Sequence, residues 1–432
     1  MRVNLKTLGC RLNEAELESW ARQFQQAGHA VVADSGDADV IVLNSCAVTE
    51  DAVRKSRQTL RRLHRENPEA KLVVSGCYAT LHPEQAGQAL GVDLLVPNAD
   101  KDRLVELTQR QLNQDSAPAF ATEPGESVLF RLGRQRAFVK VQDGCRYRCT
   151  FCIVTVARGE EKSRSVAEVV EEINALHRQG IPEAVLTGVH LGGYGGDLGL
   201  GLDELIRAVL AQTDIPRLRL GSLEPWDLPE GFFDLFDAPR LMPHLHLPLQ
   251  SGSDAVLRRM ARRCKTDEFA ALVEQARARV PDINISTDII VGFPGETEEE
   301  WAETLAFVRR IGFGHIHIFS YSPRQGTKAA ALPDHVGDAV KKTRCRELQA
   351  LAQDMKRQAL QTRVGNTYPI LWEGQRDEQP DGSIRQYGYT PNYLRVAVDL
   401  PAEHADLSAT VRSAKIERLE NGELLLASLT DD

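Results

Sequence analysis

The chain has 432 residues, of which 42% are hydrophobic and 26% are charged, and its formal net charge is −9. This length predicts two or three domains, and the composition excludes a collagen, a coiled coil and a wholly disordered chain. The longest apolar runs fall well short of the ~20 residues that cross a bilayer, and the opening MRVNLKTLGC lacks a secretory apolar region. We therefore expect a cytoplasmic protein with no membrane partner, whose eight cysteines serve metal or redox chemistry rather than disulfides.

Short apolar runs alternate with helical patterns over residues 1–115, which predicts a parallel α/β domain of the flavodoxin-like kind. Strands are expected at 3–8, 40–43, 72–74 and 93–96. A helix is expected at 14–27, with Asn13 as its N-cap. Cys10, Cys46 and Cys77 each follow the carboxyl end of a predicted strand. Because the carboxyl ends of parallel strands share one edge of the sheet, these three thiols should converge there.

A linker rich in Ala, Ser and Pro is expected at 116–130, and a second alternating series follows over 131–362. Its predicted strands are 137–141, 184–187, 218–221, 244–247, 283–291 and 315–320. Six βα units predict a partial (β/α)6 barrel, with its ligand site at the loops that follow the strands. A polar helix at 336–362 ends this domain, and residues 363–432 are typical of a small antiparallel β-barrel.

Positive charge is concentrated in two stretches, although the chain as a whole is acidic. Residues 131–164 carry nine Lys or Arg against three Asp or Glu, and residues 54–65 hold six Lys or Arg. The second stretch is equally well explained as a solvated helix face. From residue 363 onward twelve acidic residues face seven basic ones, which argues against a general attraction of this barrel to phosphate.

The spacing Cys145-x3-Cys149-x2-Cys152 directly follows the first strand of the second series. Three thiolates this close can bind three irons of a 4Fe-4S cluster and leave the fourth iron open. A zinc site normally takes four protein ligands, and no fourth Cys or His lies near in the sequence. The spacing therefore favours an iron–sulfur cluster over zinc.

This motif resembles that of the radical S-adenosylmethionine (SAM) superfamily, and its place in a six-unit βα series strengthens the resemblance. The resemblance implies that Cys145, Cys149 and Cys152 hold a 4Fe-4S cluster whose open iron binds SAM. An electron from a reducing donor then generates a 5′-deoxyadenosyl radical. The cofactors carry the hard chemistry, while the protein positions the reacting carbon and excludes water.

The three earlier cysteines, in the contexts LGC, NSC and SGC, make the resemblance narrower, because the whole chain is similar to the methylthiotransferases. Such enzymes carry a second 4Fe-4S cluster on the amino-terminal domain, so the resemblance assigns Cys10, Cys46 and Cys77 to this auxiliary cluster. Its free iron can bind the sulfur that a sulfur donor supplies. The implied reaction replaces a carbon-bound hydrogen with a methylthio group, one SAM supplying the methyl and another the radical. Cys264 and Cys345 lie on predicted helices outside both triads and are interpreted as packing residues.

Segments at later strand ends also resemble the family, in which they surround the methionine and adenosine parts of SAM. The segments are 187–195, 221–225, 247–254 and 288–297. The residues that the resemblance assigns to SAM are Phe151, Gly188, Glu224, Gln250 and Gly292. The loop from Ile153 to Gly159 lacks a proline that many relatives have, a departure that leaves the predicted cluster ligands unchanged.

The carboxyl-terminal barrel resembles the RNA-binding module called TRAM, including GYTPNYLRV at 388–396. Three of its tyrosines could stack on bases or fill the barrel core: Tyr387, Tyr389 and Tyr393. Because this barrel is acidic, we expect basic residues near the radical site to grip the RNA backbone instead. These residues are Arg158, Lys162 and Arg164.

The segments LGCRLNEAE, NSCAVTEDAVRKSRQ and TGVHLGGYG resemble the methylthiotransferases that act on N6-threonylcarbamoyladenosine, on the 3′ side of the tRNA anticodon. The type acting on isopentenyladenosine usually has Gly-Gln-Asn-Val where this chain has Gly188 to Leu191. The expected partner is therefore a tRNA anticodon loop. An Arg or Lys of the protein could recognise the carboxylate of its threonylcarbamoyl group. Two alternatives stay open: a methylthiotransferase acting on isopentenyladenosine or on a ribosomal protein, and a non-catalytic iron–sulfur protein that senses redox state or binds RNA.

Overall fold

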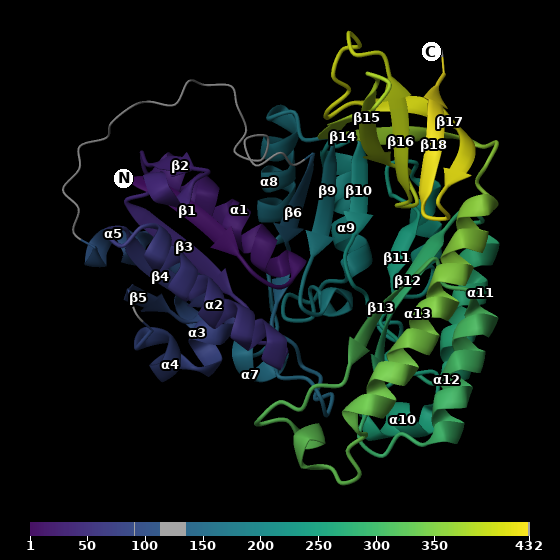
Figure 1. Ribbon diagram of the computed structural model, residues 1–432, viewed down its shortest axis with the longest axis horizontal. Helices are drawn as coiled ribbons and strands as arrows, with labels where there is room; N and C mark the ends of the chain where they lie inside the picture. The colour runs from purple at the N-terminus through teal and green to yellow at the C-terminus, as the bar shows by residue number, and fades with distance from the viewer. Residues whose placement is uncertain (90, 113–134, 431–432) are drawn as a thin grey trace.

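The computed structural model describes residues 1–89, 91–112 and 135–430 of the chain (Figure 1). The linker predicted at 116–130 lies outside these residues. Within them, three units follow one another along the chain: a parallel α/β sheet, a six-stranded partial barrel and a small closed β-barrel. The predicted fold class is confirmed.

The amino-terminal sheet is parallel, with the strand order β2-β1-β3-β4-β5. Its strands are β1 (Arg2–Thr7), β2 (Ala30–Val32), β3 (Val40–Ser45), β4 (Lys71–Gly76) and β5 (Val92–Val96). Its helices are α1 (Arg11–Gln26), α2 (Glu50–Glu66), α3 (Cys77–Leu81), α4 (Pro83–Gly87) and α5 (Leu104–Gln111). One apolar core packs α1 and α5 against the sheet, and a second packs α2 and α3 against it. The short strand β2 has only three residues, too few to leave an alternating pattern in the sequence.

Helix α1 begins earlier than the sequence pattern predicts. Cys10 is its N-cap residue, and the prediction that Asn13 caps the helix is wrong. The amide of Asn13 is buried and donates to the carbonyl oxygen of Leu8, at 2.7 Å, and to that of Ser45, at 3.3 Å. Asn13 therefore ties α1 to the ends of β1 and β3, which places Cys10 at the carboxyl edge of the sheet.

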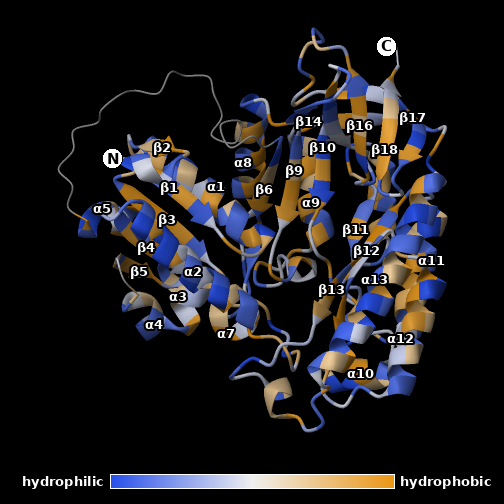
Figure 2. Cartoon of the chain, in the orientation of Figure 1, coloured by the Kyte–Doolittle hydropathy of each residue, from blue (hydrophilic) through white to orange (hydrophobic). Residues whose placement is uncertain are grey.

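The second unit contains the six predicted barrel strands, arranged as two parallel sheets with the orders β10-β9-β6 and β11-β12-β13. They are β6 (Arg136–Lys140), β9 (Glu183–Thr187), β10 (Arg217–Leu220), β11 (His244–His246), β12 (Asn284–Val291) and β13 (His315–Ser320). The longer helices around them are α8 (Val166–Arg178), α9 (Leu202–Gln212), α11 (Thr266–Arg279), α12 (Glu298–Ile311) and α13 (Asp338–Gln361). Alternate strand residues such as Ala137 and Val139 join the core beneath these helices, and the strands are accordingly apolar in Figure 2. The intervening residues face the barrel interior because successive side chains of a strand point to opposite sides.

Several short elements complete the second unit. The strands β7 (Gln142–Asp143) and β8 (Lys162–Ser163) pair with each other. Two short helices, α7 (Val154–Arg158) and α10 (Asp254–Arg259), follow strand ends at the carboxyl side of the barrel.

The carboxyl-terminal unit is a closed barrel with the strand order β14-β15-β16-β18-β17. Its strands are β14 (Thr367–Glu378), β15 (Ile384–Tyr389), β16 (Arg395–Leu400), β17 (Val411–Glu420) and β18 (Leu424–Leu429). The pairs are antiparallel except β16 with β18, which run parallel to close the barrel. A core around the fully buried Trp372 fills its interior.

The turn between β15 and β16 closes the amino-terminal end of the larger barrel. Arg217 donates to the carbonyl oxygen of Thr390, at 2.9 Å, and Arg219 donates to that of Pro391, at 3.0 Å. Both arginines also pair with the fully buried Glu183. Tyr389 and Tyr393 stack on each other with their ring centroids 4.8 Å apart, so these two rings serve the junction between barrels rather than an open surface for bases.

Candidate functional site

The triad Cys145, Cys149 and Cys152 lies in the loop after β7, at the carboxyl end of the large barrel. All three cysteines are half-buried. Burial raises the pKa of Cys145 to about 12, and the nearby Glu224 carboxylate adds to the effect. Burial likewise raises the pKa of Cys152 to about 11. The loop requires glycine before the triad, because a Cβ on Gly144 would lie 1.9 Å from the carbonyl oxygen of Glu160.

A buried histidine that the sequence analysis did not single out supports this loop. His190 hydrogen bonds through Nδ1 to Glu161 and through Nε2 to Asp227, the latter at 2.7 Å. Although burial opposes the charged form, these carboxylates raise the pKa of His190. Potential ligand atoms of Cys145, Glu161 and His190 lie within 4.8 Å of one another. Since both ring nitrogens of His190 are already engaged, the histidine is a support and not a fourth metal ligand.

The donor set therefore fits a 4Fe-4S cluster with one open iron better than it fits zinc. Three thiols without a free fourth ligand leave one coordination position for a small molecule. Arg262 donates to the sulfur of Cys149 at 3.8 Å, and a hydrogen bond to a cluster-bound sulfur tunes a reduction potential. The thiols must lose their protons to bind metal, which makes metal binding dependent on pH.

The residues predicted to bind SAM all lie at this end of the barrel. The half-buried Glu224 follows β10. Its Oε2 lies 3.7 Å from Nε2 of His190 and accepts no hydrogen bond in the part of the chain that the structure describes. Gln250 follows β11 with φ 81°, a strained conformation for a residue with a side chain, and such strain is common at ligand sites. Gly292 directly follows β12 with φ 75°, and a Cβ there would lie 2.3 Å from Cγ of Lys341. The carboxylate oxygen of Glu224 that accepts no hydrogen bond suits a donor group of a polar ligand. Contact with SAM stays a prediction for these residues.

Two further residues of the predicted SAM set occupy tight positions. A Cβ on Gly188 would lie 2.9 Å from Oε1 of Gln142. Phe151 lies between Cys149 and Cys152 and packs against an apolar cluster that includes Phe293 and Tyr321. These two residues define the shape of the site rather than its charge.

The second triad gathers at the carboxyl edge of the amino-terminal sheet, as the strand pattern predicts. Cys10 precedes α1, Cys46 follows β3 and Cys77 begins α3. A Cβ on Gly9 would lie 2.7 Å from the sulfur of Cys46, which shows how closely the loop of Cys10 approaches Cys46. Burial raises the pKa of Cys46 to about 11, and the thiols of Cys77 and Cys10 raise it further. Three converging thiols from separate strand ends fit the same kind of cluster as the first triad.

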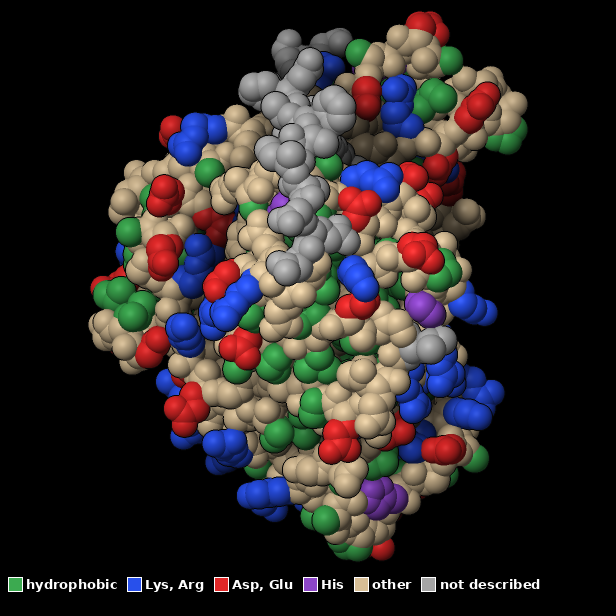
Figure 3. All heavy atoms as spheres, turned by 90° about the vertical axis from the view of Figure 1, so that its left-hand side faces the viewer, with side chains coloured by type: hydrophobic (Ala, Val, Ile, Leu, Met, Phe, Trp, Pro, Cys, Tyr) green, Lys and Arg blue, Asp and Glu red, His purple; other side chains and the backbone are tan. Residues whose placement is uncertain are grey.

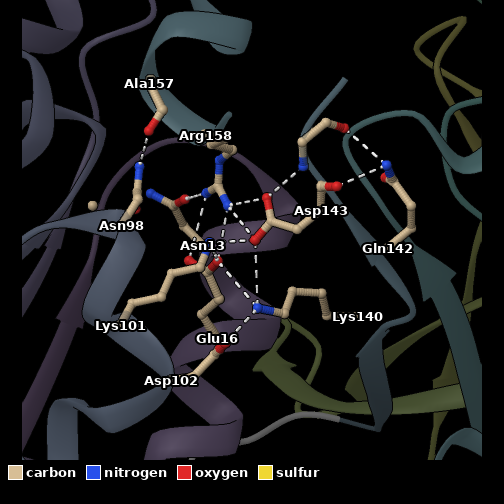
Figure 4. Close-up of polar contacts among 12 residues, drawn as sticks. Asn13, Glu16, Asn98, Lys101, Asp102, Lys140, Gln142, Asp143, Ala157 and Arg158 are labelled. Carbon is tan, nitrogen blue, oxygen red and sulfur yellow. Dashed lines mark hydrogen bonds and ion pairs between the residues drawn. The ribbon is translucent and has the colours of Figure 1, made fainter. Parts of the chain in front are cut away.

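A buried ionic network joins the loops that carry the two triads (Figure 4). Arg158 donates to Glu16 at 2.9 Å, to Asp143 at 3.1 Å and to Oδ1 of Asn13 at 2.7 Å. Lys101 pairs with both carboxylates. The network spans α1, the 3-10 helix η2 (Asn98–Arg103) and the segment from β7 to α7. It therefore holds the amino-terminal domain against the barrel beside both sets of cysteines.

Asn98 connects the same loops. Its amide donates to the carbonyl oxygen of Ala157 at 2.8 Å and approaches the sulfur of Cys77 at 3.8 Å. One side chain thus links α7 of the barrel with a thiol of the second triad.

The prediction that Arg158 grips the RNA backbone does not fit this structure. Its side chain is only 2% exposed, and its guanidinium is occupied by carboxylates and an amide, so it is not available to a phosphate. Lys162 is exposed on β8, whereas Arg164 is half-buried and pairs with Glu172. Arg164 also lines a cavity of about 230 Å³ together with Lys101, Lys140 and three carboxylates. Five of the seven Lys and Arg that the structure describes in the basic stretch therefore pair with carboxylates: Arg136, Lys140, Arg146, Arg158 and Arg164.

The exposed surface of the amino-terminal domain carries charges of both signs. Lys and Arg side chains alternate with Asp and Glu side chains across the face shown in Figure 3. On α2, Arg54 and Lys55 pair with Asp51, and Arg62 pairs with Glu66. Such exposed pairs contribute little to stability.

The ionic network predicts a loss of stability in acid. Although burial opposes ionisation, Arg158, Lys101 and Lys140 lower the pKa of Glu16 to about 2. A carboxyl group whose pKa is depressed in the folded state stabilises the protein above its unfolded pKa of about 4.3 and loses this effect as the pH falls. We expect the free energy of unfolding of the metal-free protein to fall by roughly 2–3 kcal/mol from this group between about pH 5 and pH 2.

Urea unfolding at a series of pH values tests this expectation. Glu16→Gln should flatten the acid side of the stability profile, while Glu69→Gln, which removes an exposed carboxylate, should leave the profile of the parent unchanged. An acid profile of the Glu16→Gln protein identical to that of the parent would contradict the assignment.

Comparison with known proteins matches both cysteine-bearing regions. Residues 2–97 match a family model described as uncharacterized protein family UPF0004, and residues 139–308 match the radical SAM superfamily. A threonylcarbamoyladenosine tRNA methylthiotransferase MtaB from Thermotoga maritima is 36% identical, with 86% of each chain covered. The namesake from Bacillus subtilis is 35% identical over 91% of this chain and 89% of that protein. The chain belongs to the radical SAM methylthiotransferase family.

Other matches agree with this methylthiotransferase assignment. A tRNA-2-methylthio-N(6)-dimethylallyladenosine synthase from Maricaulis maris is 35% identical over 98% of this chain and 96% of that protein. The structure of the radical SAM methyltransferase TsrM from Kitasatospora setae has a TM-score of 0.56 at 17% identity, covering 74% of this chain and 72% of that chain. This likeness extends to the fold alone. No described helix of the methylthiotransferase is both long and apolar enough to span a bilayer.

Proposed function

We propose that this enzyme replaces the hydrogen at C2 of N6-threonylcarbamoyladenosine, beside the tRNA anticodon, with a methylthio group. The observation that carries the proposal is the pair of cysteine triads on two domains joined by one buried network, in a chain whose relatives include proteins named for this nucleoside. The segment Gly188 to Leu191 supports it, because it resembles the threonylcarbamoyladenosine type. A single-stranded anticodon loop lets a purine leave its stack at low cost, which the reaction requires.

Radical SAM enzymes use SAM and a 4Fe-4S cluster, and we assign that cluster to Cys145, Cys149 and Cys152. When bound, the cluster and SAM supply the radical chemistry that breaks the carbon–hydrogen bond. The chain itself holds SAM between the strand-end loops, with Glu224 as an acceptor for a donor group of the ligand. Gly188 and Gly292 let these loops pack closely against Gln142 and Lys341. Phe151 and its apolar neighbours exclude water from one side.

In the proposed reaction, the second triad provides the site at which the transferred sulfur binds. Cys10, Cys46 and Cys77 would hold an auxiliary 4Fe-4S cluster, whose open iron would supply a binding position for the sulfur. The overall reaction needs a sulfur donor for the new carbon–sulfur bond, a methyl group from SAM and electrons from a reducing partner. For the tRNA backbone, the exposed Lys162 is a candidate contact, and the half-buried Arg164 could join it if it leaves Glu172.

Nucleoside mass spectrometry of tRNA from a deletion strain tests the proposal. We expect loss of 2-methylthio-N6-threonylcarbamoyladenosine and accumulation of the unthiolated nucleoside, with recovery when the parent gene is restored. A restored gene encoding Cys10→Ala should leave the precursor in place. Loss of the methylthio-isopentenyl nucleoside instead would contradict the proposal and indicate the activity for which the Maricaulis maris relative is named. A mass change confined to a ribosomal protein would exclude tRNA as the substrate.

A further inference from the structure

Arg11 lies between the second cysteine triad and the interior of the large barrel. It follows Cys10 directly and is the first residue of α1, a helix that packs against β6. Its guanidinium carbon is 5.3 Å from the centroid of the Phe138 ring and 5.7 Å from that of the Tyr393 ring. It donates to the hydroxyl oxygen of Tyr393 at 3.2 Å. Arg11 is nevertheless an exposed residue, so its remaining donors are accessible.

The aromatic neighbours show which way Arg11 points. Phe138 alternates on β6 with Ala137 and Val139, which belong to the core beneath the helices, so Phe138 faces the barrel interior. Tyr393 belongs to the turn that closes the amino-terminal end of the same barrel and lies 5.0 Å from the ring of His244. Arg11 therefore reaches from the edge of the amino-terminal domain into the barrel interior.

Three other arginines near Arg11 are neutralised by carboxylates. Glu183 lies 2.9 Å from Arg217 and 3.0 Å from Arg219, and Glu373 pairs with Arg136. Arg11 has no ion pair with a carboxylate among the residues that the structure describes. A cation that faces an enzyme's interior without a counter-charge is suited to receive one from a ligand.

The remaining titratable groups near Arg11 supply no competing positive charge. Burial, with Arg11 among the nearby charges, lowers the pKa of both His244 and His317, and burial lowers that of His315 to about 4. These imidazoles are therefore neutral at neutral pH. The carboxylate of Asp288 lies 3.2 Å from Nε2 of His246. At the carboxyl end of the barrel, Arg262 donates to the sulfur of Cys149 and to the carbonyl oxygen of Pro248, so Arg11 is the cation of the other end of the interior that is available for recognition.

We propose that Arg11 binds the carboxylate of the substrate nucleoside's side chain and thereby selects a charged modification over an apolar one. This inference rests on the function proposed above and names the residue that recognises the threonylcarbamoyl group. The planar guanidinium can donate two parallel hydrogen bonds to a carboxylate. Because Arg11 is the first residue of α1 and Cys10 is its N-cap, the side chain that binds the carboxylate extends from the same helix end that carries a thiol of the second triad. An isopentenyl side chain would leave the guanidinium unpaired, which costs binding free energy.

The test compares two anticodon stem-loops with the reconstituted full-length enzyme. One stem-loop carries threonylcarbamoyladenosine, and the other carries the same nucleoside with its carboxylate converted to a neutral carboxamide. The parent should prefer the carboxylate by about 10- to 100-fold in kcat/KM, the size expected for hydrogen bonds to a charged group. Arg11→Gln should lower kcat/KM for the carboxylate by a similar factor and abolish the preference, and Arg11→Lys should restore part of it. Arg207→Gln, at an exposed position on α9, is the matched control and should keep the full preference.

The preference is a ratio within one protein preparation, so it does not depend on how much cluster each variant holds. An Arg11→Gln enzyme that still prefers the carboxylate would overturn the role of Arg11 while the proposed function stands. A parent enzyme that modifies an isopentenyladenosine stem-loop and neither of these two would instead overturn the proposed function.

Discussion

Replacing Cys145, Cys149 and Cys152 together by alanine is expected to abolish SAM cleavage and to remove about half of the iron of the reconstituted protein, about four of eight atoms. The reason is that the three thiols lie on one loop and no free fourth ligand lies beside them among the described residues, since His190 is held by two carboxylates. Without these thiols the barrel site holds no iron to bind SAM. Reductive incubation with SAM under anaerobic conditions, with measurement of 5′-deoxyadenosine and iron, gives both results.

The amino-terminal triad provides the complementary experiment. Replacing Cys10, Cys46 and Cys77 by alanine should remove the other half of the iron yet leave SAM cleavage measurable, because the barrel site is complete without them. Replacing Cys264 and Cys345, which lie outside both triads, should change neither quantity; Cys264 packs in the barrel core and Cys345 against it. Full iron content in the amino-terminal triple variant would refute the auxiliary cluster.

Arg158→Met is expected to lower the free energy of unfolding of the metal-free protein by about 3 kcal/mol, within the range measured when one partner of a buried ion pair is removed. The variant removes the donors that satisfy Glu16, Asp143 and Asn13 at the domain junction. Because α1 and α7 are joined through this guanidinium, their amide hydrogens should exchange faster in the variant. Urea unfolding and hydrogen–deuterium exchange with mass spectrometry measure the two effects.

Arg54→Met is the matched control for this change. Arg54 is an arginine in an ion pair as well, but its side chain is 66% exposed on α2, where such a pair contributes about 0.5 kcal/mol or less. If Arg158→Met had as small an effect as Arg54→Met, the network in Figure 4 would not be what joins the domains.

The sequence by itself determined the features that depend on local spacing. The alternation of apolar runs with helical patterns predicted the parallel strands and the six-unit barrel. The short spacing of Cys145, Cys149 and Cys152 predicted one cluster, and strand-end placement predicted that Cys10, Cys46 and Cys77 converge, because parallel strands end at one edge. These predictions need only the spacing of apolar residues along a strand or helix and the short distance that a loop of a few residues can span.

Only the tertiary structure decided which partner each charged or aromatic side chain meets. Arg158 belongs to a basic stretch of sequence, yet in the folded protein it is buried and paired with the carboxylate of Glu16, 142 residues away. The sequence predicts that Tyr393 lies on the surface or in the core of the small barrel, yet its ring closes the amino-terminal end of the large barrel. No sequence pattern marks His190 or Arg11. His190 contacts carboxylates from distant loops, and Arg11 contacts aromatic rings on two other domains. Charge and stacking act through space over a few ångströms, so their outcome depends on how the domains pack and cannot be read from spacing along the chain.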